Sequence, residues 1–224
     1  MTIIQTVRNA AIAATMALPV FGDGLTIGKK GPTNLQLQNV TTHNVEKKST
    51  STNTAIKYWD KNKWAIVSQP YVWNKNKEGT GDLTILGGPR GDHGTLHYNS
   101  FAGMTVPTGK IGSDKPTVRA GVLATKTFLD NKCEVDVALQ GNFPLDNAPN
   151  SYKTSIVVGG NLSKTWKAGV GYRNIHVNGE NKGTAIGVVR KLFPNVKGKP
   201  HAEFRVNQGI YGGSIAQMLL RWNF

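Results

Sequence analysis

Several stretches of this sequence alternate strictly between apolar and polar residues, and this pattern is the strongest constraint on its fold. In residues 132–140, KCEVDVALQ, every second position is apolar and most positions between them are charged or polar. The same alternation recurs in 166–173 (WKAGVGYR) and in 202–207 (AEFRVN). A period of two residues is typical of β-strands, because successive side chains point to opposite faces of a sheet. We therefore expect strands with one apolar and one polar face.

Similar runs, separated by turn residues, fill the chain after about residue 33. Strands of this length, in an even number, cross a membrane when they are tilted by about 45° and closed into a barrel. The expected fold class is all-β: a transmembrane up-and-down antiparallel β-barrel of about 12 strands, within a range of about 10 to 14. The predicted strands are 34–43, 53–60, 63–73, 81–88, 94–107, 117–129, 132–144, 152–164, 166–177, 183–193, 200–210 and 213–224.

The connections between the predicted strands also alternate. Counted from the N-terminus, the odd ones are mostly long and polar, such as NVEKKSTSTN, and the even ones are mostly tight, such as DKNK. In outer-membrane barrels, short periplasmic turns alternate with longer external loops. If both chain ends lie on the periplasmic side, the odd connections are external.

The first 22 residues have the features of an export signal. One Arg precedes a mostly apolar stretch that ends at Phe21, and Val20 and Gly22 fit the small-residue pattern before a cleavage site. We expect a signal peptide at 1–22 and one outer-membrane β-barrel domain at 23–224. The alternative is an N-terminal amphipathic helix that stays attached. No later segment approaches the roughly 20 apolar residues of a membrane-spanning helix, so a membrane-embedded fold must be a barrel.

Alternation alone does not say which face of the strands forms the core. A soluble barrel turns its apolar face inward, whereas a membrane barrel turns it toward lipid. The export signal and the aromatic residues near strand ends favour the second arrangement, because aromatic girdles mark membrane interfaces. The expected membrane-girdle residues are Trp64, Tyr71, Trp73, Trp166, Tyr172, Trp222 and Phe224. The expected lumen-lining residues are Arg119, Lys132, Glu134, Asp136, Arg173, Glu203, Arg205 and Arg221.

The chain ends in the alternating run MLLRWNF. A terminal Phe on such a strand resembles the signal by which bacterial outer-membrane barrels are recognised for assembly. The barrel assembly machinery, acting on the C-terminal strand, is therefore an expected partner, together with the lipids of the outer membrane.

The formal net charge is +14, and most lysines lie in turn-like stretches. Such a rim can simply aid solubility, or it can attract anions such as lipid phosphates and acidic solutes. No run of Lys and Arg interleaved with aromatic residues resembles a nucleic-acid module, so we expect no nucleic-acid partner. The single cysteine, Cys133, excludes an intrachain disulfide. No catalytic or metal-ligating pattern is evident, so we expect no enzyme activity, no metal site and no cofactor.

The segment 63–110 resembles a known family. A strand ends in PYVWN, a polar loop leads to GTGDLTI, and a second strand ends in VPTGK. These elements are similar to those of the outer-membrane barrel family labelled for the meta-cleavage pathway of phenol degradation. The resemblance covers about 50 residues and implies a porin-like or transporter role. The matching residues are Gly81, Asp82, Leu83, Thr84, Pro107, Thr108 and Gly109.

These observations predict a monomeric outer-membrane barrel of a Gram-negative-type bacterium that passes small solutes passively or by facilitation. The resemblance implies small aromatic or hydrophobic solutes, whereas the arginines of the polar parity favour anions. One alternative is a non-conducting structural or surface-binding outer-membrane barrel. Another is a soluble secreted β-barrel or sandwich that binds a ligand. A third, an outer-membrane lipid enzyme, requires Ser and His side chains close together near one rim, and nothing in their spacing supports this.

Overall fold

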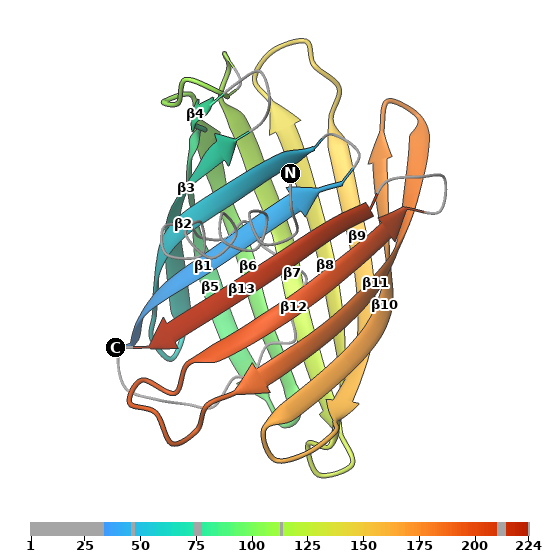
Figure 1. Ribbon diagram of the computed structural model, residues 1–224. Helices are drawn as coiled ribbons and strands as arrows, with labels where there is room; N and C mark the ends of the chain where they lie inside the picture. The colour runs from blue at the N-terminus through green and yellow to red at the C-terminus, as the bar shows by residue number, and fades with distance from the viewer. Residues whose placement is uncertain (1–33, 46–47, 74–77, 113, 210–213, 224) are drawn as a thin grey trace.

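The computed structural model describes residues 34–223 except 46–47, 74–77, 113 and 210–213 (Figure 1). The predicted signal peptide and Phe224 lie outside the described residues. No helix in the described part of the chain has the length and apolarity to span a membrane. The strands are β1 (Asn34–Asn44), β2 (Ser49–Trp59), β3 (Lys63–Trp73), β4 (Glu78–Thr80), β5 (Leu83–His93), β6 (Leu96–Val106), β7 (Thr117–Phe128), β8 (Cys133–Pro144), β9 (Ser151–Asn161), β10 (Trp166–Val177), β11 (Glu180–Leu192), β12 (His201–Gly209) and β13 (Ser214–Asn223).

The sheet closes into a barrel. Strand β1 pairs antiparallel with β13, with Leu37 opposite Trp222, and this pairing joins the first strand to the last. Strand β3 pairs with both β2 and β5, so the short β4 lies beside a closed ring of twelve strands. Figure 1 shows these strands tilted around one axis, with β1 next to β13. Closure satisfies the backbone hydrogen bonds within the sheet, as a membrane requires. The predicted up-and-down barrel is confirmed.

Strand boundaries follow the alternating pattern closely. Strands β3 and β10 coincide with the predicted 63–73 and 166–177. The largest difference is at β5, which runs from Leu83 to His93, whereas the prediction ended at 88. The second half of β5 reads GGPRGDH and has no apolar alternation, so the pattern could not show its end. The three-residue strand β4 is too short to show a pattern, and the prediction missed it.

Side-chain exposure shows that the apolar parity faces outward. Val137, Val170 and Phe204 are 38%, 71% and 52% exposed, whereas Glu134 and Arg205 are each 2% exposed. A soluble protein buries its apolar residues and exposes its charges, so this order is the reverse of the usual one. Hydrocarbon chains around the barrel account for it. An eleven-residue strand, rising about 3.3 Å per residue and tilted by about 45°, spans roughly 25 Å of this apolar layer.

The two ends of the barrel carry different connections. Strand β1 begins and β13 ends at one end, here called the terminal end, and β4 lies at the other, the loop end (Figure 1). The sorting of connections by length is looser than predicted, because 193–200 at the terminal end is longer than the turn Asn178–Gly179 at the loop end. Positive φ angles of 50° and 81° at that turn suit an Asn-Gly hairpin. The terminal end carries 60–62, 94–95, 129–132, 162–165 and 193–200.

The β2–β3 turn at the terminal end is fixed by one carboxylate. Asp60 Oδ1 accepts hydrogen bonds from the backbone N–H groups of Asn62 (2.8 Å) and Lys63 (2.9 Å). The Asn62 N–H in particular holds the pKa of Asp60 below its ordinary value, because it stabilises the ionised form. The turn places Trp59 and Trp64 opposite each other in the β2–β3 ladder.

Candidate functional site: the barrel lumen

One side of the lumen is built from ion pairs. Arg190 on β11 lies opposite Glu203 on β12. The Nε and Nη2 atoms of Arg190 donate to Glu203 Oε2 at 3.0 and 2.6 Å, and Arg205 Nη2 donates to Oε1 at 3.0 Å. Both oxygens of this buried carboxylate are therefore held by charged donors, which form the stronger class of hydrogen bond. We call the buried charged side chains of β8 to β12 the ionic wall: Glu134, Asp136, Lys167, Arg190, Glu203 and Arg205.

A second ion pair joins β8 and β10 across β9, which has a glycine at the position between them. Lys167 Nζ on β10 donates to Glu134 Oε2 on β8 at 2.8 Å. The intervening residue on β9 is Gly159, which pairs with both Glu134 and Gly169. Two adjacent glycines leave room for the lysine stem to pass. Nearby, Asp136 accepts a hydrogen bond from the Thr125 hydroxyl.

The other side of the lumen is apolar. Trp64 and Phe101 meet edge to face, with ring centroids 6.1 Å apart and planes at 67°. Trp64 Nε1 donates to the Ser100 carbonyl at 3.0 Å, so the polar atom of the indole is satisfied as well. Trp59 and Leu123 pack against this cluster. We call its buried members the aromatic wall: Ala55, Trp64, Ile66, Leu86 and Phe101.

The predicted positions of two site residues, Trp64 and Lys132, are wrong. Trp64 does not belong to a membrane girdle, because its side chain is 2% exposed inside the barrel. Strand β3 carries apolar residues on both parities, with Ile66 inside and Val67 outside, so alternation could not identify its outer face. Lys132 does not line the lumen. It is exposed in the turn before β8, where its N–H donates to the Leu129 carbonyl.

The other predicted lumen residues lie on inward parities. Glu134, Asp136, Glu203 and Arg205 are buried. The remaining three are partly buried on the inward positions of β7, β10 and β13: Arg119, Arg173 and Arg221. That any of these residues contacts a solute stays a prediction.

Three predicted girdle residues point outward with similar exposure. Trp166, Tyr172 and Trp222 are 42%, 43% and 44% exposed. Trp166 and Trp222 lie at the terminal end, and Lys191 Nζ lies 4.7 Å from the centroid of the Trp166 ring. Tyr172 instead lies midway along β10, opposite Ile156, and so is not at a strand end.

Two more predicted girdle residues lie at the loop end. Tyr71 and Trp73 share the parity of the outward Val67, and their rings are 4.6 Å apart. The Tyr71 hydroxyl donates to Glu78 Oε1 on β4 at 3.0 Å. That these aromatic residues form a membrane girdle stays a prediction.

The prediction missed Lys57, Lys167 and Arg190 as lumen residues. Arg190 lies in GTAIGVVRKLF, where apolar residues occupy both parities, so its direction could not be read. Lys167 lies on the polar parity of a strictly alternating run, and this signal was sufficient to find it. Lys57 lies next to aromatic residues that look like a girdle in sequence but face inward in the barrel.

The residues that carry the family resemblance lie together at the loop end, where hydrogen bonds join four of them: Asp82, Leu83, Thr108 and Gly109. Asp82 Oδ1 accepts from the N–H groups of Thr108 (3.3 Å) and Gly109 (3.5 Å), and the Leu83 N–H donates to Thr108 Oγ1 at 3.0 Å. A Cβ atom at Gly109 would lie 2.3 Å from the Gly81 carbonyl oxygen, so only glycine fits there. We call this unit the loop lock: Gly81, Asp82, Leu83, Thr84, Pro107, Thr108 and Gly109.

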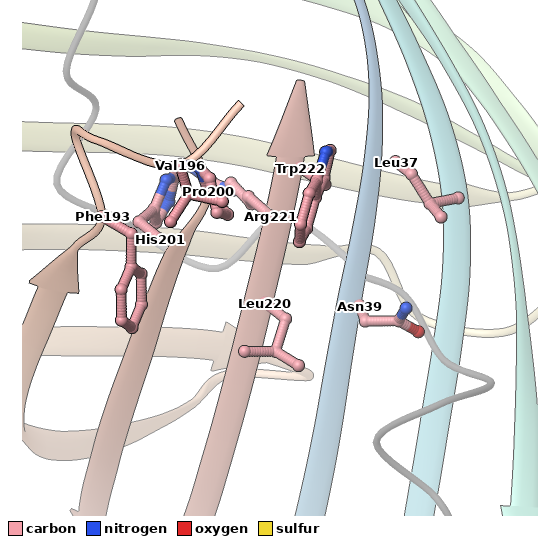
Figure 2. A pocket seen from close by; sticks show the side chains of 9 residues that line it. All are labelled: Leu37, Asn39, Phe193, Val196, Pro200, His201, Leu220, Arg221 and Trp222. Carbon is pink, nitrogen blue, oxygen red and sulfur yellow. The ribbon is translucent and has the colours of Figure 1, made fainter. Parts of the chain in front are cut away.

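A cavity of about 450 Å³ lies at the terminal end, near the junction of β13 and β1. Figure 2 shows Leu37, Leu220 and Trp222 around it, together with Phe193 and Val196 of the 193–200 connection. Leu37, Leu220 and Trp222 lie on outward parities, whereas His201 and Arg221, which also line this cavity, lie on inward parities. Gly198 lies against the Trp222 indole, and its carbonyl accepts from the Asn223 N–H at 3.2 Å. The connection thereby supports the end of the last strand.

Solved structures share this architecture. An outer membrane channel from Pseudomonas putida F1 has a TM-score of 0.70 and 13% identity, over 90% of this chain and 100% of that one. The KdgM porin has a TM-score of 0.59 and 11% identity, over 84% and 99% of the two chains. The NanC porin has a TM-score of 0.62 and 6% identity, over 83% and 98%. The shared fold is that of outer-membrane barrels of Gram-negative bacteria.

Sequence comparison gives two results. No curated protein matches the chain. A family model matches residues 12–208, far beyond the segment 63–110 that carries the resemblance found by inspection, and it confirms that resemblance. The chain belongs to the family described as "Putative MetA-pathway of phenol degradation".

Proposed function

We propose that this protein passes small solutes passively across the outer membrane, with no chemical step and with a preference for anions. Small aromatic or hydrophobic compounds that carry a negative charge are the solutes that suit both walls of the lumen. The family description and the channel and porin names of the structural neighbours support passage as the role.

The preference for anions rests on one observation, the charge balance of the lumen. In the ionic wall, Lys167 pairs with Glu134, and Arg190 and Arg205 both pair with Glu203. Asp136 accepts a hydrogen bond from the Thr125 hydroxyl. Outside the ionic wall, the inward cations Lys57, Arg119 and Arg221 form no ion pair or hydrogen bond with any described residue. A lumen whose wall carries surplus positive charge concentrates anions.

The test is conductance in planar lipid bilayers. We expect the refolded protein to give discrete current steps in KCl, and a salt gradient to give a reversal potential of the sign for chloride. Arg119→Gln should shift that potential toward cations, because it removes one unpaired inward charge. Lys63→Gln is the matched control, since Lys63 is exposed at the end of a turn and its removal should change nothing.

Two outcomes contradict the proposal. A barrel that is correctly folded, as judged by a heat-dependent shift in gel mobility, but electrically silent would favour the structural or surface-binding alternative. A conducting barrel that prefers potassium would remove the anion preference.

A further inference from the structure

One cation lies among the lumen aromatics without an acidic partner. Lys57 points inward from β2, and its Nζ lies 5.0 Å from the Trp64 ring centroid and 5.9 Å from that of Trp59. Both distances are within the range of cation–π attraction. The ammonium group forms no hydrogen bond or ion pair with any residue that the structure describes. Its charge is thus balanced only by ring faces.

Further positive charge faces the same place. Arg221 on β13 and Arg90 on β5 lie on inward positions near the terminal end of the lumen, as Lys57 does on β2. The Arg221 Nε atom is buried and has no hydrogen-bond partner among the described residues. Arg221 forms no ion pair with any carboxylate of the described residues. Cations gathered in this way repel one another, and a bound anion would relieve the repulsion.

The strand register brings these groups to the terminal end of the lumen. Lys57 pairs with Gln36 of β1, and Arg221 pairs with Gln38, so the two cations flank β1 on its inner side. The Gln36 and Gln38 amides hydrogen-bond to each other, which makes the surface between the cations polar but uncharged. On the other side of Lys57 the surface is aromatic.

A ligand that suits this arrangement needs a flat apolar body and one negative group. We infer that Lys57, Arg221, Trp59 and Trp64 form a binding site for small aromatic monocarboxylates at the terminal end of the lumen. The carboxylate meets Lys57 and Arg221, and the ring lies against the two indoles. The role of this site depends on the proposed function, because the site would bind solutes as they pass through the lumen.

Selectivity follows from the two parts of the site. Acetate has the charge but not the ring, benzyl alcohol has the ring but not the charge, and cyclohexanecarboxylate has the charge with a ring that is not flat. Benzoate combines both features and should bind most tightly, because aromatic contact and charge-assisted hydrogen bonds act together.

The test uses the folded full-length barrel in detergent with benzoate as the probe. Binding is measured by isothermal titration calorimetry and by quenching of tryptophan fluorescence, which reports on rings in contact with the ligand. We expect Lys57→Met to weaken benzoate binding by roughly tenfold or more, the effect of losing one charged partner. Lys57→Arg should retain much of the affinity. Lys63→Gln, on the next strand but exposed, is the matched control.

A second variant guards against a folding defect. Trp59→Leu should weaken benzoate binding and leave acetate binding unchanged, because it removes a ring and no charge. The inference is overturned if Lys57→Met, shown to be folded by its gel mobility, binds benzoate as the wild type does. Equal binding of benzoate and acetate would also overturn it.

The same preparation separates this site from the proposed passage function. Current steps with no saturable benzoate binding would refute the site and leave passage intact. Benzoate binding that depends on Lys57, in a barrel that carries no current, would refute passage and leave the site intact.

Discussion

The ionic wall and the aromatic wall line the same lumen, but different forces hold them together. In the ionic wall, Arg190, Glu203 and Arg205 are nearly inaccessible to solvent, so each charge depends on its partner. In the aromatic wall, Trp64 and Phe101 are held by shape and by apolar contact. Removing one member of a buried ion pair leaves an uncompensated charge, whereas trimming an aromatic side chain leaves a gap.

From this difference we expect similarly conservative substitutions in the two walls to have unequal effects on the free energy of unfolding. An isosteric change that removes only charge should be severe in the ionic wall. A change that nearly preserves volume should be mild in the aromatic wall.

The largest effect is expected for Glu203→Gln. The change keeps the shape of the side chain but leaves Arg190 and Arg205 without a carboxylate. We expect it to lower the free energy of unfolding by about 3–5 kcal/mol. Urea titration in detergent micelles, followed by tryptophan fluorescence, measures the loss. The control is Glu180→Gln, whose exposed pair with Lys182 at 3.4 Å should contribute less than about 1 kcal/mol. Equal effects from the two variants would contradict the contrast between the walls.

A smaller effect is expected for Glu134→Gln. This change leaves one cation, Lys167, without its carboxylate, whereas Glu203→Gln leaves two cations without theirs. We expect a loss of about 2 kcal/mol. The double variant Glu134→Leu with Lys167→Met converts this part of the ionic wall into an apolar surface. It should recover most of the loss, since well-packed apolar pairs can replace buried ion pairs at little cost. Additive losses in the same urea assay would show that the two residues act independently.

Phe101→Leu probes the aromatic wall with a similar degree of conservation. We expect a loss of about 1 kcal/mol, because apolar volume is nearly kept and only the edge-to-face contact with Trp64 is lost. The tryptophan emission spectrum should change, since Trp64 is the indole in contact. A loss as large as that of Glu203→Gln would remove the distinction between the walls.

The smallest effect is expected outside both walls, in the loop lock. Asp82→Asn keeps an oxygen that can accept from Thr108 and Gly109 but weakens these hydrogen bonds by removing the charge. We expect a change of less than about 1 kcal/mol in global stability. Limited proteolysis should nevertheless cut the 107–116 connection faster. Unchanged cleavage would mean that the lock does not hold this connection.

How much the sequence could predict depended on whether a strand has one apolar face. Strands β8, β10 and β12 alternate strictly, and the predicted outward and inward faces of these strands are correct, although Lys167 was not recognised as a lumen residue. Strands β3 and β11 carry apolar residues on both faces, so the predicted direction of Trp64 was wrong and the direction of Arg190 could not be predicted. Lys132 was wrong for a different reason: the turn before β8 reaches one residue further than the alternation suggested.

The sequence by itself determined the strands, their number in the closed ring and the inverted placement of apolar and charged residues. The strands follow from the period of two, which is a local property of the chain. The outward placement of the apolar face followed instead from the predicted export signal and the aromatic residues near strand ends, because alternation alone does not decide it. Only the tertiary structure decided which inward residues meet. The pairing of Glu134 with Lys167 across Gly159, and the approach of Lys57 to two indoles, depend on register and closure. Both arise from contacts between strands, and a single strand's pattern contains no information about its neighbours' alignment.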